Sequence, residues 1–304
     1  MTYCINPACP KPANDSKADR CQACGSELLL RDRYRVIKLL GQGGFGATFV
    51  ARDRSLPGNP ICVIKQLRIA SKSPDVLRQA RELFAREAKT LGKVGNHPQV
   101  PRLLDYFDSD RQFYLVQEYV KGHTIKQEVK KNGPYDEQRV LDFLKGILPL
   151  LQYLHDNEVI HRDIKPANII RRDIDNQLVL IDFGAVKDEV SQTQIALDEQ
   201  TAFTSMAIGT PGFAPPEQMS LRPVYASDIY ALGATCLFML TGKSPNRLGY
   251  DPITSEIAWR DKIQVSDRLF ALLEKMLEVS VRHRYQSAGQ VLYDLDRPET
   301  VPTP

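Results

Sequence analysis

The sequence predicts an α+β protein with a β-rich first lobe, a helical second lobe and a small four-cysteine head in front of them. Three observations carry this expectation: cysteines crowd the first 24 residues, strand-like runs around a glycine cluster start at Arg33, and helical periodicity dominates from Asp136. At 304 residues the chain is longer than one hydrophobic core usually supports, so a two-lobed unit with a small addition is expected.

The composition excludes several classes of partner. The 40 basic and 37 acidic residues give a formal net charge of +3, too balanced for a nucleic-acid binder with a dominant basic stripe. The longest apolar run, Ile229 to Leu240, is far shorter than the roughly 20 residues that a membrane span needs. The N-terminal residues lack an apolar stretch for a secretory signal, so a cytoplasmic location and reduced thiols are expected.

The head is defined by Cys4, Cys9, Cys21 and Cys24, in the pattern C-x4-C-x11-C-x2-C. Tetrahedral Zn²⁺ prefers four soft ligands from two short loops, and about 30 residues are too few to fold without such a staple. We therefore expect residues 1–30 to form a zinc-ribbon-like segment. Redox-active thiols that form disulfides and disordered free thiols are the alternatives.

Strand patterns dominate the first lobe. Residues 33–51 alternate around the glycine cluster, and Ile61 to Leu67 is a β-branched run typical of a buried strand. A helix is expected from Ser73-Pro74 to about Leu91, because proline is favoured in the first helical turn. Two further strand-like segments, 102–107 and 112–120, complete this lobe.

Helical patterns dominate the second lobe. A helical apolar stripe begins at Val140, and a short β region covers residues 159–183. Further helices are expected at 227–240, 267–278 and 287–296.

Gly41, Gly43 and Gly46 fit the pattern G-x-G-x-x-G, whose glycines let backbone amides approach phosphate oxygens. The pattern is weak alone, because it occurs by chance in roughly one chain in ten of this length. A dinucleotide-binding interpretation requires a helix at the third glycine and an acidic residue about 20 positions later, and neither is present. A glycine loop between two strands, with a lysine on the third strand, is instead the arrangement that covers ATP in protein kinases.

The lysine on the third strand is Lys65. By the two-residue period of a strand, Val63 and Lys65 share one face, which is expected to line the cleft beside the glycine loop. A lysine among apolar neighbours needs a counter-charge, and Glu87 lies at the edge of the predicted helix's apolar stripe, where it can reach inward. A surface lysine and a surface glutamate are the plain alternatives.

The strongest signal is HRDIKPANII at residues 161–170, whose five fixed polar letters match by chance with odds on the order of one in ten thousand. Asp163 can orient the hydroxyl proton of an acceptor, and Lys165 can neutralise charge on a transferring phosphoryl group. Asn168 can supply an oxygen to Mg²⁺ or Mn²⁺. Fourteen residues later, Asp182 opens Asp-Phe-Gly after a buried strand and is the expected ligand for the metal that bridges the ATP phosphates.

On these motifs, the chain from Tyr34 to Arg297 resembles bacterial eukaryotic-like serine/threonine protein kinases. The resemblance implies a bilobal protein-kinase fold and an ATP-dependent enzyme that phosphorylates proteins. In this family, a lysine at the position of Lys165 marks serine/threonine kinases. The cysteine head is similar to segments that precede some bacterial kinases, notably those common in cyanobacteria.

The resemblance also assigns an adenine pocket and one ion pair. It places Gln117 at the rear of the pocket, with Glu118 to Val120 as the hinge whose backbone holds adenine. Val63 belongs to the roof of the pocket. Glu217, in the run that closes the activation segment, is expected to pair with Arg284.

Arg162 immediately precedes the catalytic aspartate, and kinases with this pair are often activated by phosphorylation of the activation segment. Thr204 is the favoured phosphosite, because it lies six residues before Thr210, near where bacterial relatives carry the modification. Thr201 and Ser205 are the neighbouring candidates.

The expected partners are ATP and protein substrates, with no nucleic acid and no membrane segment. Residues 34–297 are expected to form the kinase domain and the Pro-rich residues 298–304 a tail or the start of a linker, so a dimer and further C-terminal domains stay open. A signalling scaffold that binds a partner through the cysteine head is the alternative function. Lys165 and Glu217 argue against a small-molecule phosphotransferase.

Overall fold

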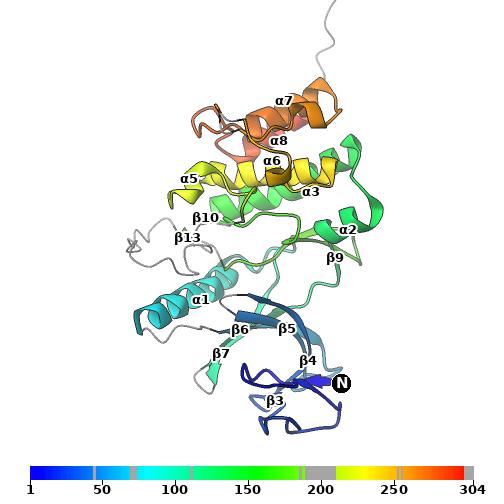
Figure 1. Cartoon of the computed structure of the whole chain (residues 1–304), viewed down its shortest axis with the longest axis vertical. Coiled ribbons are helices and arrows are strands. Elements are labelled where there is room, and N and C mark those ends of the chain that lie inside the picture. Colours follow the sequence, from blue (N-terminus) through cyan, green and yellow to red (C-terminus); the bar gives the residue numbers. More distant parts are fainter. Residues whose placement is uncertain are drawn as a thin grey trace, which may run out of the picture. The chain divides into compact units, whose positions relative to one another are not determined.

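The computed structural model describes residues 1–43, 46–68, 74–109, 112–184, 187–188, 210–251, 253–254 and 256–297. The chain divides into two compact units, which we treat separately. The first unit comprises Met1–Asn96 and Pro101–Val120, and the second comprises His97–Val100 and Lys121–Pro304. Strands predominate in the first unit and helices in the second (Figure 1). The predicted α+β class is therefore confirmed.

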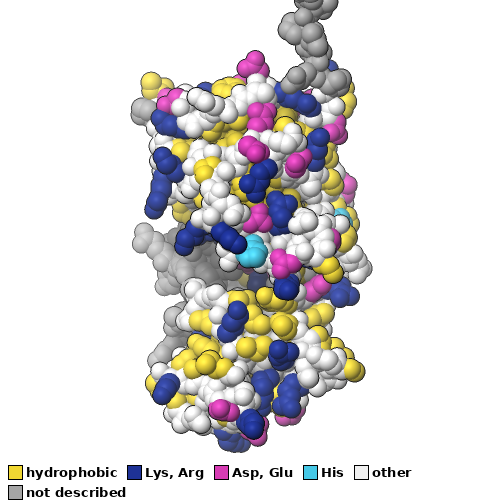
Figure 2. Space-filling model, turned by 90° about the vertical axis from the view of Figure 1, so that its right-hand side faces the viewer, with side chains coloured by type: hydrophobic (Ala, Val, Ile, Leu, Met, Phe, Trp, Pro, Cys, Tyr) yellow, Lys and Arg dark blue, Asp and Glu magenta, His cyan; other side chains and the backbone are white. Residues whose placement is uncertain are grey.

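The surface mixes charges of both signs. On the face drawn in Figure 2, basic and acidic side chains lie interspersed with apolar and neutral ones. This agrees with the balanced composition of 40 basic and 37 acidic residues. Among the described residues, no helix is both long and apolar enough to cross a membrane.

The first unit is built on an antiparallel sheet with the strand order β3-β4-β5-β6-β8-β7. The strands span Leu29–Leu30 (β3), Tyr34–Gly43 (β4), Gly46–Asp53 (β5), Ile61–Leu67 (β6), Leu103–Ser109 (β7) and Gln112–Glu118 (β8). Helix α1, Pro74–Val94, begins at the predicted proline and continues past the predicted end at Leu91. The helix continues through Gly92, which costs it about 1 kcal/mol relative to alanine, and ends before the second glycine, Gly95.

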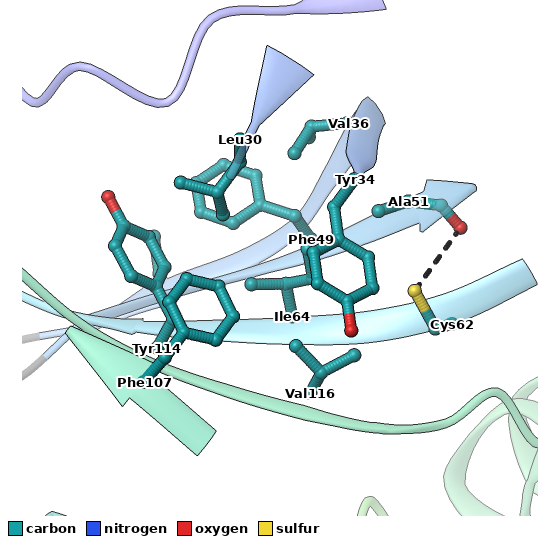
Figure 3. Packing of buried hydrophobic residues seen from close by; sticks show 11 residues of the cluster. Leu30, Tyr34, Val36, Phe49, Ala51, Cys62, Ile64, Phe107, Tyr114 and Val116 are labelled. Carbon is teal, nitrogen blue, oxygen red and sulfur yellow. Dashed lines mark hydrogen bonds between the residues drawn. The ribbon is translucent and has the colours of Figure 1, made fainter. Parts of the chain in front are cut away.

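An apolar cluster covers one face of this sheet. Phe49, Ile64 and Val116 are fully buried in it, and the Cys62 thiol donates a hydrogen bond to the carbonyl oxygen of Ala51 (Figure 3). Because side chains alternate along a strand, the neighbour of Ile64 in the sequence, Lys65, lies on the opposite face. One face of β6 thus packs in the apolar cluster, and the opposite face carries Lys65.

The cysteine head joins the sheet through the hairpin of β3 and β4. The head has two strands of its own, Thr2–Tyr3 (β1) and Ala13–Asn14 (β2), which pair antiparallel. Between β3 and β4 the chain turns at Arg31 and Asp32, which both have left-handed φ angles, 54° and 53°. Two consecutive left-handed residues make the turn whose twist matches paired strands. The head therefore continues directly into β4.

The second unit contains helices α2 (Ile125–Asn132), α3 (Glu137–Asp156), α5 (Pro216–Met219), α6 (Tyr225–Thr241), α7 (Asp267–Met276) and α8 (Ala288–Asp296). Side-chain caps fix four of the starts, those of α2, α3, α7 and α8; Thr124, for example, accepts from the Gln127 amide before α2, and Asp136 accepts from the Arg139 amide before α3. Helix α6 is apolar on nearly all sides and lies in the core. The short strands are β9 (Gly122–Thr124), β10 (Val159–Ile160), β11 (Ile169–Arg172), β12 (Leu178–Leu180) and β13 (Lys187–Asp188).

The predicted ion pair between Glu217 and Arg284 is confirmed. Arg284 Nη1 lies 2.7 Å from Glu217 Oε1, and the Arg284 side chain is 0% exposed. Arg284 also donates to the carbonyl oxygens of Ala226 and Glu278. A buried cation needs such partners, because an unpaired one is strongly destabilising. Arg284, which precedes α8, therefore links α5 through Glu217 to the start of α6 through Ala226.

Candidate functional site

In the first unit, Lys65 and Glu87 form a buried ion pair. Lys65 lies in the middle of β6, opposite Thr48 of β5 and Leu115 of β8. Glu87, on α1, is 4% exposed. Because a buried carboxylate needs a positive partner, the Lys65 ammonium group compensates its charge. The pair holds the ammonium group on the sheet face opposite the apolar cluster.

The glycine loop is formed by the β4–β5 hairpin, in which Gly41 pairs with Thr48 and Gly43 with Gly46. A Cβ atom at Gly46 would lie 2.3 Å from the Gln66 carbonyl oxygen, so only glycine fits there. A Cβ atom at Gly41 or Gly43 would meet nothing within 4 Å. These two glycines leave space beside their backbone that a large group can enter.

The residues assigned to the adenine pocket lie together on β6 and at the end of β8. Val63 pairs with Gln117 across the two strands, and Gln117 is 6% exposed. Glu118 closes β8, and its amide donates to the carbonyl oxygen of Arg102. Val120 follows as the last residue of the first unit.

In the second unit, Asp163 is the centre of a hydrogen-bond network. Its Oδ2 accepts from Lys165 Nζ at 2.7 Å and from Asn168 Nδ2 at 2.9 Å. Its Oδ1 accepts from the Thr210 hydroxyl at 2.7 Å, and Lys165 Nζ also donates to that hydroxyl oxygen at 2.7 Å. The carboxylate is therefore held from both sides in one orientation.

Asn168 and Asp182 lie at the same end of the β11–β12 hairpin. Ile169 pairs with Leu180, and the Ile181 amide donates to the Asn168 carbonyl oxygen at 2.8 Å. The Nδ2 atom of Asn168 donates to Asp163. The side-chain oxygen, Oδ1, is therefore the atom of this amide that can act as a metal ligand. Carboxylate and amide oxygens are the ligands that Mg²⁺ prefers, and these two residues fit such an ion.

The backbone of the 161–163 turn is held by a buried carboxylate on α6. Asp228, 0% exposed, accepts from the amides of His161 and Arg162, each at 2.8 Å. Arg162 and Asp182 both have left-handed φ angles, 68° and 69°, which are unfavourable for residues other than glycine. The two Asp228 bonds stabilise this conformation at Arg162.

The sequence patterns predict no site role for Thr210 or Asp228. The predicted phosphosites Thr201, Thr204 and Ser205 lie outside the described residues.

The four cysteines of the head come together. Their sulfur atoms all lie within 4.8 Å of one another, with Cys4 and Cys24 at 3.6 Å and Cys9 and Cys21 at 3.5 Å. A tetrahedral zinc site with Zn–S bonds of about 2.3 Å has sulfur–sulfur edges of about 3.8 Å. The cluster therefore fits a zinc ion.

Side-chain amides also approach these sulfur atoms. Asn14, 6% exposed, donates to Cys21 Sγ at 3.5 Å, and Asn6 donates to Cys24 Sγ at 3.8 Å. Burial opposes ionisation of Cys21, yet amide hydrogen bonds from Ala23, Cys24 and Asn14 lower its thiol pKa to about 6. Burial raises the pKa of the Cys4 thiol. These hydrogen bonds thus favour the thiolate form of Cys21, and the thiolate is the form that binds metals.

The protein kinase domain family matches residues 34–294. The chain is 59% identical to serine/threonine-protein kinase B of Synechocystis sp., with 98% of this chain and 52% of that protein aligned. It is 44% identical to serine/threonine-protein kinase PknA of Nostoc sp. (91% and 50%) and 32% identical to PknB of Mycobacterium leprae (88% and 43%). The chain spans about half the length of these curated relatives.

Proposed function

Since the chain belongs to the protein kinase family, we propose that it transfers the γ-phosphoryl group of ATP to serine or threonine hydroxyls of proteins. The observation that carries the proposal is the Asp163 carboxylate, oriented by Lys165, Asn168 and Thr210. Phosphoryl transfer needs mainly positioning and charge neutralisation, which this arrangement supplies. The curated relatives named above as serine/threonine-protein kinases support the choice of acceptor.

In this proposal, Asp163 accepts a hydrogen bond from the acceptor hydroxyl and directs its oxygen toward the phosphorus atom. Lys165, held within 2.7 Å of Asp163, neutralises charge on the transferring group. Lys65 binds the α- and β-phosphates, and Glu87 keeps its ammonium group in place. Gly41, Gly43 and Gly46 let backbone amides approach the phosphates.

The same proposal assigns the metal and the adenine. Asn168 and Asp182 hold Mg²⁺ or Mn²⁺, which neutralises the phosphate oxygens when bound. Val63 and Gln117 line the adenine pocket, and the backbone from Glu118 to Val120 binds the base.

The proposal is tested by incubating the purified chain with γ-labelled ATP and Mg²⁺ and identifying the labelled amino acid. We expect phosphoserine or phosphothreonine, on the chain itself or on a general protein substrate. Label on no hydroxyl, together with intact partner capture by the head, would favour the scaffold alternative instead.

We propose that phosphorylation of Thr204 activates the enzyme through Arg162. Arg162 is 9% exposed and its carbonyl oxygen accepts from Gln218 Nε2 at 2.6 Å, so its backbone is fixed. A phosphate on Thr204 adds charge that an arginine can bind. We expect Thr204→Ala to lower the initial rate on an added protein substrate about tenfold, the worth of one charge-assisted hydrogen bond.

The matched control for Thr204→Ala is Thr254→Ala, an exposed threonine of the second unit. Phosphate content is measured by intact mass in both variants. Full turnover by a completely phosphate-free Thr204→Ala enzyme would show that this residue is not the switch.

For the head, we propose one Zn²⁺ bound by Cys4, Cys9, Cys21 and Cys24. The sulfur spacing and the lowered pKa of the Cys21 thiol support this ligand set. Metal-bound thiolates are maintained in a reducing compartment, so we place the domain in the cytoplasm. Redox regulation by disulfide formation remains the competing role for the same thiols.

A further inference from the structure

The cysteine head packs on the apolar face of the first unit's sheet. Thr2, fully buried, donates its hydroxyl to the Val36 carbonyl oxygen of β4 at 2.8 Å. The rings of Tyr3 and Phe49 lie 5.9 Å apart, and Ile5 packs against the same cluster. The N-terminus accordingly lies beside β4 (Figure 1). The head is thus a layer of the first unit.

Arg68 joins this layer to the end of β6. Its Nη2 donates to the Ile5 carbonyl oxygen at 2.8 Å, and its guanidinium carbon lies 5.4 Å from the centre of the Phe49 ring. Its Nε donates to Gln66 Oε1 at 2.7 Å. Ile5 directly follows Cys4, the most deeply buried cysteine of the head. The Arg68 side chain therefore connects the loop around Cys4 to the end of β6.

Gln66 carries this connection to the site. It is 2% exposed, and its Nε2 donates to the Tyr114 hydroxyl at 3.2 Å. Its carbonyl oxygen is the atom that a Cβ at Gly46 would strike, at 2.3 Å. Gln66 also directly follows Lys65. Arg68 therefore holds the side chain of Gln66, the residue whose own backbone follows Lys65 and lies against the third glycine of the loop.

We propose that Arg68 is a positioning residue for nucleotide binding, which fastens the cysteine head to β6 and thereby holds Lys65 and Gly46 in place. The inference rests on the proposed ATP-dependent function for its kinetic consequence. Arg68 itself touches no reacting group. Arg68 acts through Gln66 and the main chain of β6. We therefore expect its loss to weaken ATP binding more than it slows the chemical step.

The test compares Arg68→Gln with Arg54→Gln in the full chain. Both remove one positive charge from the first unit, but the Arg54 side chain is exposed. In Arg68→Gln we expect amide hydrogens of residues 1–14 and of β6 to exchange about tenfold faster, because a charged hydrogen bond is lost. We expect the KM for ATP to rise by about three- to tenfold, with kcat within about twofold of wild type.

Two further variants keep the test decisive. Arg68→Lys retains the charge but replaces the two-pronged guanidinium, so its KM for ATP should fall between those of wild type and Arg68→Gln. Tyr3→Ala loosens the same contact from the head and should raise the KM in the same direction, even if Arg68→Gln folds poorly. The zinc content of each variant shows whether the cluster itself stays intact.

The outcomes separate the two proposals. Faster exchange in the head and β6 with an unchanged KM for ATP would overturn the positioning role. Identical exchange and kinetics in Arg68→Gln and Arg54→Gln would overturn the connection itself. A wild-type chain that binds no ATP would instead refute the proposed function, while the exchange data would still report on the head contact.

Discussion

Replacing Asp163 by asparagine is expected to lower the rate of phosphoryl transfer by about 10²- to 10⁴-fold, the usual contribution of a positioned acid–base group. The carboxylate accepts from Lys165, Asn168 and Thr210 at 2.7 to 2.9 Å. An asparagine places an NH₂ group on one branch, and that group cannot accept a hydrogen bond from any of these donors. The acceptor hydroxyl would lose both its orientation and its proton acceptor.

The measurement is single-turnover transfer from labelled ATP, with ATP affinity determined separately. Because the proposed role of Asp163 is to bind the acceptor hydroxyl, and the contacts to ATP and its metal are assigned to other residues, we expect ATP binding to change little. Asp261→Asn is the matched control, since that side chain is 71% exposed. If Asp163→Asn transfers phosphate within about twofold of the wild-type rate, the proposed role of this carboxylate is wrong.

Lys65 illustrates what local patterns can predict. The two-residue period of a strand assigned it to one face, and the helical stripe placed Glu87 at an edge from which it can reach inward. Both rules depend only on neighbouring residues. The structure then joins the two in one ion pair. The pair between Glu217 and Arg284 was also predicted, but only from resemblance, because 67 residues separate its members.

Local sequence patterns cannot predict the roles of Thr210 and Asp228. Thr210 reaches Asp163 across 47 residues, and Asp228 accepts two backbone amides 66 and 67 residues before it. Neither contact leaves a periodic trace in the sequence. Asp228 accepts these two bonds from main-chain amides, and its side-chain partner His155 lies 73 residues before it. Long-range contacts of this kind depend on the tertiary fold.

The position of the head could not be predicted for the same reason. The change of composition at Leu30 predicts that residues 1–30 form a separate segment. In the structure, Met1–Asn96 fall in one compact unit with the sheet. The contacts that join them run largely to main-chain oxygens: those of Val36, Ile5, Ser16 and Ala18. Carbonyl acceptors are present at every residue and carry no sequence signal.

The second large effect is expected at Cys4. We predict one zinc ion per wild-type chain and none in Cys4→Ser, because a serine hydroxyl is a poor replacement for a thiolate ligand. Structural zinc sites contribute about 10–16 kcal/mol of apparent binding free energy, which in so small a segment is also folding free energy. Residues 1–30 should therefore lose their protection from protease in Cys4→Ser and in chelator-treated wild type.

Elemental analysis of protein purified without metal-scavenging tags measures the zinc content, and Cys236→Ala is the control. Cys236 is a fully buried thiol of α6 outside the cluster, so this variant should keep its zinc. Titration of thiols in denaturant then distinguishes the competing role. Six reactive thiols per chain agree with a metal site, whereas two, the number outside the cluster, indicate that the four cysteines have formed disulfides. Because a metal site requires thiolates and a disulfide consumes them, the two results cannot both describe the same chain.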